Sequence, residues 1–177
     1  MALTLLRHPE PVIESGICYG RSDIDAHVLN EKGLAELVEG LPQPIQRIDS
    51  SPLIRCKRLA EQLAATLALP VSQDPRLMEI DFGRWEMRPW DDIPRAEIDD
   101  WAADMIGARP HGGETVTEMT ERARSYLDQH VQEEESVVAV THLGFIRCAH
   151  AVLGHEDAYG LSMDYAEFTI LEPRESL

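Results

Sequence analysis

The chain has 177 residues, of which 44% are hydrophobic and 27% are charged, so it is too apolar for a disordered protein and fits one globular domain over residues 1–177. Its 16 basic and 32 acidic residues leave a formal net charge of −16. This balance argues against nucleic acid and anionic membranes as partners, because both require a positive field. A small anionic ligand stays open, since a few cationic side chains reverse the potential inside one pocket.

Cysteine usage and the first residues indicate a cytoplasmic protein. Cys18, Cys56 and Cys148 are an odd number at scattered positions, without metal-binding or disulfide-type spacing, so we expect reduced, buried thiols. The first seven residues have no basic stretch before their apolar residues, unlike a signal peptide. The longest nearly apolar stretch, residues 63–71, is far shorter than the ~20 residues that span a bilayer.

The first half of the chain alternates short apolar runs with helical periodicity. Residues 3–6 predict a buried strand, and residues 30–41 carry one apolar stripe that predicts an amphipathic helix. Residues 45–50 predict a second strand. Ser51 and Pro52 then resemble an N-cap and a first helical residue, so a helix is expected to run from there to about residue 69.

The second half continues the alternation after an irregular stretch over residues 77–113. Thr115 and Glu118 fit a capping box at the start of a helix. The elements expected here are a helix over about 95–105, a helix over 115–130, a strand over 136–141, a helix over 144–153 and a strand over 168–171. Strands that alternate with helices predict an α/β fold on a mostly parallel sheet.

Cationic side chains follow the predicted strands. Arg7 and His8 end the first strand, His142 ends the strand over 136–141, and Arg55 lies about one turn into the helix after the second strand. The carboxyl ends of parallel strands meet at one sheet edge, where ligands bind. A single histidine at a strand end is more often simply hydrogen-bonded, but three such places together indicate a phosphate pocket.

The chain resembles the histidine phosphatase superfamily, also called phosphoglycerate mutase-like, along nearly its whole length. The resemblance implies a three-layer α/β/α sandwich. It is carried by five motifs in order, which are Leu6-Arg7-His8, Ser51-Pro52-Leu53-Ile54-Arg55, Glu79 to Glu86, His111-Gly112-Gly113-Glu114 and Val140-Thr141-His142-Leu143-Gly144.

The resemblance implies a reaction and a role for each motif residue. His8 is the expected nucleophile and forms a phosphohistidine. Arg7, Arg55 and His142 are expected to hold the phosphoryl oxygens. Glu79 is expected to protonate the leaving alkoxide and then to activate water. Neither a metal nor a cofactor is needed, since arginine and histidine neutralise the charge. Glu114 is either part of the site's outer shell or an ordinary acid at a helix start.

Within the superfamily, softer motifs are most similar to the α-ribazole-5′-phosphate phosphatases of cobalamin biosynthesis. These are Tyr19-Gly20, the stretch 82–86 and the stretch 90–95. The expected partner is therefore a small phosphorylated metabolite, and a homodimer is the family-level expectation. Tyr19, Trp85 and Leu143 are the expected substrate-pocket residues, although Trp85 and Trp90 could equally pack the irregular segment.

Some residues depart from the family pattern. Pro9 and Leu143 stand at positions where relatives usually have glycine, and Met87 stands where ribazole phosphatases often have glycine. Two alternatives remain open, a phosphoglycerate mutase and a catalytically silent module that binds phosphate or a partner. The enzymatic interpretation requires that the cationic groups converge and that the His8 ring can be reached.

Overall fold

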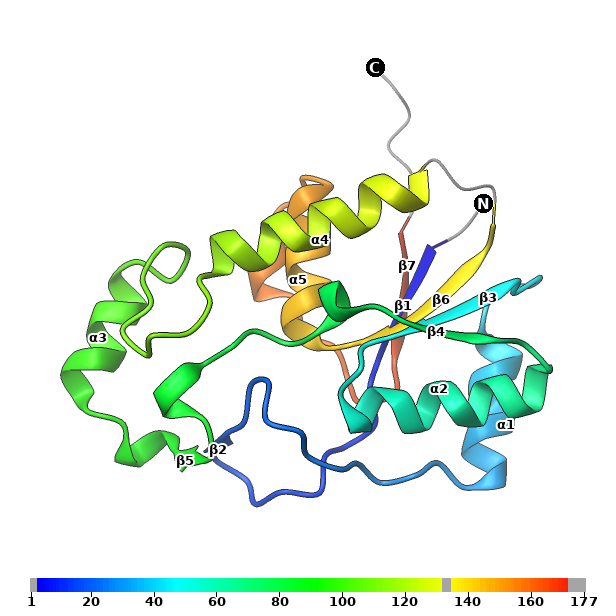
Figure 1. Cartoon of the computed structure of the whole chain (residues 1–177), viewed down its shortest axis with the longest axis horizontal. Helices are drawn as coiled ribbons and strands as arrows, with labels where there is room; N and C mark the ends of the chain where they lie inside the picture. Colours follow the sequence, from blue (N-terminus) through cyan, green and yellow to red (C-terminus); the bar gives the residue numbers. More distant parts are fainter. Residues whose placement is uncertain (1–2, 132–134, 172–177) are drawn as a thin grey trace.

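A five-stranded sheet forms the centre of the molecule in this computed structural model, which describes residues 3–131 and 135–171 (Figure 1). Its strands, in spatial order, are β4 (Val71–Gln73), β3 (Arg47–Ser50), β6 (Val137–Thr141), β1 (Leu3–Arg7) and β7 (Phe168–Leu171). The first four strands are parallel, and β7 pairs antiparallel with β1 at the edge. The expected α/β fold with a mostly parallel sheet is confirmed.

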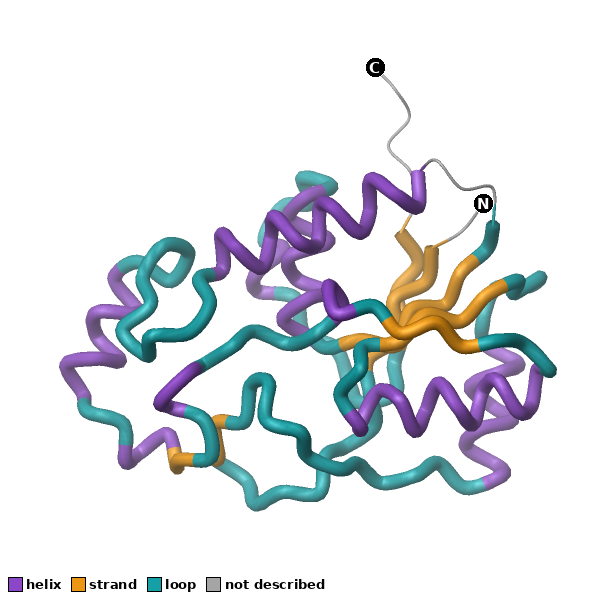
Figure 2. The backbone as a smooth tube through the Cα atoms, in the orientation of Figure 1, coloured by secondary structure: helices purple, strands orange, loops and turns teal. Residues whose placement is uncertain are grey.

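Two pairs of helices cover the sheet, one on each face (Figure 2). On one face lie α1 (Glu31–Gly40) and α2 (Ile54–Leu67), and on the other lie α4 (Val116–Val131) and α5 (Leu143–Val152). Successive strand residues point to opposite faces, so Leu5 packs in the α4 and α5 core while Leu6 packs in the α1 and α2 core. This is the three-layer arrangement that the resemblance implied.

The irregular stretch, residues 77–113, joins the distant residues 17–18 in a unit beside the sheet. It contains a two-stranded ladder of β2 (Ile17–Cys18) and β5 (Arg88–Pro89), followed by helix α3 (Arg95–Ala103). The described residues also contain four 3₁₀ turns, η1 (Pro75–Leu77), η2 (Gly83–Trp85), η3 (Trp90–Asp92) and η4 (Ala158–Gly160). Trp85, Cys18 and Ile93 form a small apolar core here. The unit adjoins the carboxyl ends of the parallel strands and supplies one wall of the site described below.

The N-terminus of α4 has the expected capping box, whereas the N-terminus of α2 differs from the expected one. The capping box before α4 forms as expected, because Thr115 Oγ1 accepts from the Glu118 amide and Glu118 Oε2 accepts from the Thr115 amide. The Ser51 cap is wrong, since α2 begins only at Ile54 and its N-cap side chain makes no capping bond. Asp23, from a distant loop, accepts from the Ile54 amide at 2.7 Å instead. Ser51 Oγ accepts from the Leu53 amide at 3.4 Å and lies 2.9 Å from His142 Nε2.

All three cysteines are buried and unpaired, as expected. Burial raises the pKa of the Cys148 thiol to about 11, so this group is inert at neutral pH. In the described part of the chain, every helix is too short or too polar to cross a membrane.

A buried ionic cluster joins β3 to α4 on the sheet face away from α2. The Asp49 carboxylate accepts from Tyr126 Oη at 2.8 Å and from Arg47 Nε at 3.0 Å, and its Oδ2 lies 3.1 Å from His130 Nε2. Burial alone raises the pKa of Asp49, but the hydrogen bonds from His130, Tyr126 and Arg47 outweigh it and leave that pKa below its ordinary value. The ionised carboxylate therefore stabilises the fold.

We expect Asp49→Asn to lower the free energy of unfolding at neutral pH by about 2–3 kcal/mol, because it leaves buried donors poorly paired. A lowered folded-state pKa contributes stability above the ordinary aspartate range near 4 and loses it as the pH falls through the folded pKa. Urea unfolding of both proteins should therefore show the largest difference at neutral pH and a smaller one in acid. Asp128→Asn, on the exposed face of α4, is the control. A difference that does not change with pH contradicts the ionic role.

Candidate active site

The predicted phosphate-pocket residues converge at the carboxyl ends of the parallel strands. Arg7 of β1 pairs with Thr141 of β6, so His8 and His142 follow side by side, and their ring centroids are 5.1 Å apart. Arg55 lies in the first turn of α2, directly after the neighbouring strand β3. The topology therefore brings together groups from three separate stretches of sequence.

His8 is held in one tautomer. Its amide donates to Thr141 O at 3.0 Å, and its Nδ1 lies 2.6 Å from Pro9 O. A carbonyl only accepts, so Nδ1 carries the proton and Nε2 keeps its lone pair. Burial, and then the charges of Arg55 and Arg7, lower the pKa of His8 to about 3. The ring is therefore neutral, and Pro9 supplies the ordering carbonyl even though it lacks the amide that glycine would offer.

Arg55 is completely buried and every side-chain nitrogen donates. Its Nη1 donates to Ser22 O at 2.8 Å, its Nη2 to Gly20 O at 2.7 Å and its Nε to His142 Nδ1 at 3.3 Å. Because a guanidinium cannot accept, His142 Nδ1 is the acceptor, and His142 Nε2 carries the proton that reaches Ser51 Oγ at 2.9 Å. Burial and the Arg55 charge hold the pKa of His142 well below its ordinary value.

Arg7 reaches the site with unused hydrogen-bonding capacity. Its Nη1 donates to Met163 O, whereas its buried Nε has no hydrogen-bond partner among the residues the structure describes. Its guanidinium lies over the Tyr165 ring, 4.0 Å from the centroid. Positive charge at the site therefore comes from arginine side chains. Across residues 3–131 and 135–171, no group of three or more His, Cys, Asp or Glu side chains could hold a metal ion.

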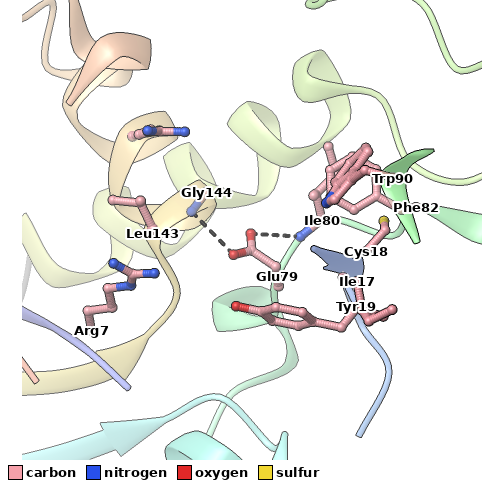
Figure 3. Close-up of a pocket in the computed structure, with 12 residues that line it drawn as sticks. Arg7, Ile17, Cys18, Tyr19, Glu79, Ile80, Phe82, Trp90, Leu143 and Gly144 are labelled. Carbon is pink, nitrogen blue, oxygen red and sulfur yellow. Dashed lines mark hydrogen bonds between the residues drawn. The ribbon is translucent and has the colours of Figure 1, made fainter. Parts of the chain in front are cut away.

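Glu79 lies in a cavity of about 240 Å³, between Arg7 on one side and Tyr19 on the other (Figure 3). Its Oε1 accepts from the Ile80 amide at 3.0 Å, and its Oε2 accepts from the Gly144 amide at 3.3 Å, at the start of α5. The remaining lining residues are largely apolar, namely Ile17, Cys18, Gly20, Ile80, Phe82, Trp90, Leu143, Gly144 and Arg147. Tyr19 and Leu143 thus line the cavity, as expected.

A second ionic cluster supports the backbone of Glu79. Glu114 is paired with Arg21 at 3.0 Å and with Arg122 at 2.7 Å. Both arginines also donate to the Glu79 carbonyl, at 3.0 Å from Arg21 Nε and 3.1 Å from Arg122 Nη2. The Glu114 carboxylate is therefore bound to these arginines, close behind Glu79. Sequence reasoning left the role of Glu114 open and missed both arginines, because no local pattern links them.

Trp85 is not a pocket residue, which corrects the expectation from the sequence. Its side chain is fully buried in the irregular unit, where Nε1 donates to Glu97 Oε2 at 2.7 Å and the ring packs against Phe82. Trp90 lines the cavity instead. The two tryptophans are five positions apart in a stretch of turns, where no helix or strand period predicts which side chain faces inward.

The nucleophile candidate is covered in this conformation. His8 is 1% exposed, and the Tyr165 ring centroid lies 5.8 Å from that of His8. The required convergence of cationic groups is met, whereas the required access to the His8 ring is closed here by Tyr165. The sequence offered no signal for this residue, which lies in the turn before β7.

Comparisons with known sequences agree with this geometry. Residues 3–176 match the model of the histidine phosphatase superfamily, branch 1. A probable phosphoglycerate mutase GpmB from Yersinia enterocolitica is 32% identical over 130 residues, which cover 70% of this chain and 60% of that relative. GpmB from Yersinia pestis (strain Pestoides F) is 37% identical over 90 residues, or 49% of this chain and 41% of that relative. The chain thus matches about two fifths to three fifths of the length of these relatives.

Solved structures show the same fold. The mycobacterial glucosyl-3-phosphoglycerate phosphatase Rv2419c is 27% identical with a TM-score of 0.75, over 96% of this chain and 88% of that one. The protein TTHB049 from Thermus thermophilus is 26% identical with a TM-score of 0.73, over 97% of this chain and 94% of that one. With these neighbours and the matched family model, the chain belongs to the histidine phosphatase superfamily, branch 1.

Proposed function

We propose that this protein is a phosphomonoesterase that works without a metal ion, through a phosphohistidine on His8. The observation that carries the proposal is the state of His8, a neutral imidazole whose Nδ1 is bound to Pro9 O while Nε2 keeps its lone pair. A fixed lone pair beside two guanidinium groups suits attack on phosphorus, because the cations stabilise the charge on the phosphoryl oxygens. Pro9 is compatible with this role, which speaks against the silent-module alternative.

Arg7, Arg55 and His142 are the proposed phosphate-binding residues. Arg7 Nε is a buried donor without a partner, and burying such a donor is costly unless a ligand satisfies it. Arg55 stays charged at any working pH and is rigidly held by three acceptors. His142 orders Arg55 through Nδ1 and turns its N–H toward Ser51, so its own contact with phosphate requires exchange of that bond.

The reaction then proceeds in two balanced steps. His8 Nε2 attacks phosphorus, the ester P–O bond breaks, and Glu79 gives its proton to the leaving oxygen. Water next attacks the phosphorus of phosphohistidine, Glu79 takes one water proton, and the P–N bond breaks to release phosphate. Glu79 is suited to this role because two backbone amides hold its carboxyl group in the wall of the cavity.

The cavity lining supports an ester whose alcohol has an apolar face, and α-ribazole 5′-phosphate, with its aromatic base, is the substrate we propose. Phe82 and Trp90 present aromatic rings to the cavity, and Tyr19 adds a third. Met87, in place of the glycine of many ribazole phosphatases, keeps a left-handed backbone with φ +61° and an exposed side chain. This substitution therefore preserves the backbone conformation that glycine favours.

A phosphoglycerate mutase is the second candidate, favoured by the similarity to GpmB sequences and to the solved phosphoglycerate mutase from Thermus thermophilus. Hydrolysis is favoured by the likeness to glucosyl-3-phosphoglycerate phosphatase, which has also been solved with VO3. Vanadium oxyanions resemble a phosphoryl group in transfer. Phosphate esters are therefore the shared substrate class of both candidates.

A phosphate-release screen over small esters tests the proposal, with α-ribazole 5′-phosphate and 3-phosphoglycerate included. A phosphatase releases inorganic phosphate from at least one ester, and we expect α-ribazole 5′-phosphate to have the highest kcat/KM. A mutase instead returns an isomer and needs a bisphosphate primer. If no ester is turned over, with or without primer, the result contradicts both the phosphatase and the mutase. The module that only binds phosphate or a partner then remains.

A further inference from the structure

Backbone hydrogen bonds hold the turn that carries Tyr165 next to His8. The Ala166 amide donates to His8 O at 3.2 Å, and the Arg7 amide donates to Glu167 O at 2.9 Å, so the turn before β7 is bonded to the nucleophile's own strand end. Ala166 has φ +58°, a left-handed conformation that is unfavourable for alanine. Such strain persists only where the surrounding structure requires it, and it is concentrated at functional sites.

Tyr19 approaches the same place from the other side. It lines the cavity together with Arg7 and Glu79 (Figure 3), and the Arg55 guanidinium lies 5.3 Å from its ring centroid. Burial, and then the neighbouring Tyr165 through its charge and a hydrogen bond, raise the pKa of Tyr19 well above its ordinary value, so the Tyr19 phenol is neutral and pairs with Tyr165. Each tyrosine ring therefore contacts one of the two arginines proposed to bind phosphate.

The two tyrosines line different cavities. Tyr165 lines a groove of about 520 Å³ between α1 and the turn before β7, whereas Tyr19 lines the cavity that holds Glu79. His8 and Arg55 line neither and are 1% and 0% exposed. In this conformation a phosphoryl group in the Glu79 cavity consequently reaches His8 only after side chains around His8 move, and the Tyr165 ring lies next to the His8 ring.

We propose that Tyr165, paired with Tyr19, is a substrate-contacting residue that covers His8. Only a dianionic phosphoryl group displaces its ring and gains access to His8. This inference rests on the proposed function. A guanidinium gains less from a tyrosine face than from charge-assisted hydrogen bonds to phosphate, so a dianion displaces the rings from Arg7 and Arg55. A monoanionic ester, such as a sulfate ester, forms weaker charge-assisted hydrogen bonds with the arginines, so the Tyr165 ring stays over His8. The pair therefore selects for phosphomonoesters and keeps His8 from bulk water.

Chemical labelling of His8 tests the cover without any need for turnover. Diethyl pyrocarbonate modifies neutral, accessible imidazoles, and the exposed His27 is an internal reference for reagent activity. We expect Tyr165→Ala to raise the His8 labelling rate relative to His27 by about tenfold or more. This factor follows if His8 in the wild-type protein is uncovered at most about a tenth of the time. Tyr165→Phe, which keeps the ring, should raise it much less. Peptide mass spectrometry reads both sites.

Tyr165 is 39% exposed, so Tyr165→Ala leaves no cavity in the core. Tyr159→Ala, a tyrosine at η4, is the matched control for general loosening and should leave His8 labelling unchanged. Inorganic phosphate should slow His8 labelling in Tyr165→Ala. Equal His8 labelling in wild type and Tyr165→Ala overturns the proposal, even if phosphatase activity is found.

A kinetic readout tests the selectivity. Relative to wild type, Tyr165→Ala should lose about tenfold or more of the preference for p-nitrophenyl phosphate over p-nitrophenyl sulfate in kcat/KM, since Arg7 then lacks its competing ring. An unchanged preference alongside faster His8 labelling overturns the selective role of Tyr165. Absence of any turnover in wild type contradicts the proposed function instead, while the labelling result still reports on the cover.

Discussion

Replacing His8 with alanine is expected to abolish phosphate release, with a loss of at least about 10³-fold in kcat, while the protein stays folded. The loss follows because alanine has no nitrogen to accept the phosphoryl group, and no other neutral imidazole in the site has a free lone pair. His142 Nδ1 already accepts from Arg55, and its Nε2 carries a proton. The variant is measured by phosphate release and by circular dichroism.

The intermediate gives a second measurement for the same residue. Wild-type protein, quenched in alkali during turnover of a ³²P-labelled ester, should carry an acid-labile label on the peptide that contains His8. His8→Ala should carry none. His27→Ala, an exposed histidine, is the control that should keep both turnover and label. Turnover of His8→Ala at the wild-type rate would remove His8 from the nucleophilic role.

Replacing Glu79 with glutamine is expected to slow the first step about 10²–10⁴-fold for an alkyl phosphate, the usual range for a lost general acid. The first step with p-nitrophenyl phosphate should change far less, because p-nitrophenolate leaves without protonation. Rapid mixing with p-nitrophenyl phosphate should therefore retain a burst of nitrophenol. The steady rate after the burst should fall, because water is no longer deprotonated by Glu79.

Glu61→Gln, an exposed position on α2, is the control for the loss of one negative charge. It should leave both substrates unaffected. Equal losses in the first step for alkyl and nitrophenyl esters from Glu79→Gln would rule out the acid role, and would point instead to a change in the amide contacts of Ile80 and Gly144 with that side chain.

The long elements could be predicted from the sequence because their side chains repeat with a clear period. The run at residues 137–141 is completely buried, as the unbroken apolar residues 137–140 indicated, and the helix over 116–131 begins at its capping box. Strand β4 was missed, since its three residues are half-buried or exposed and carry no apolar pattern. The start of α2 was misplaced because its cap, Asp23, comes from elsewhere in the chain.

The candidate site could be predicted only as far as its motif residues. Arg7, His8 and His142 lie at strand ends, where parallel topology forces neighbours together. Arg21 and Arg122, which hold Glu79 from behind, act through bonds between segments that are far apart in sequence. Neither periodicity nor motif spacing in the sequence predicts such contacts.

The amino-acid order predicts the alternation of strands and helices, the family and the set of cationic and acidic residues at the site, since these follow from local pattern and motif. The folded structure adds that His8 is a neutral imidazole with a free Nε2, that Trp85 is buried while Trp90 faces the cavity, and that Tyr165 covers His8. Proton positions, burial and cover depend on distances through space, and the chain acquires those distances only when it folds.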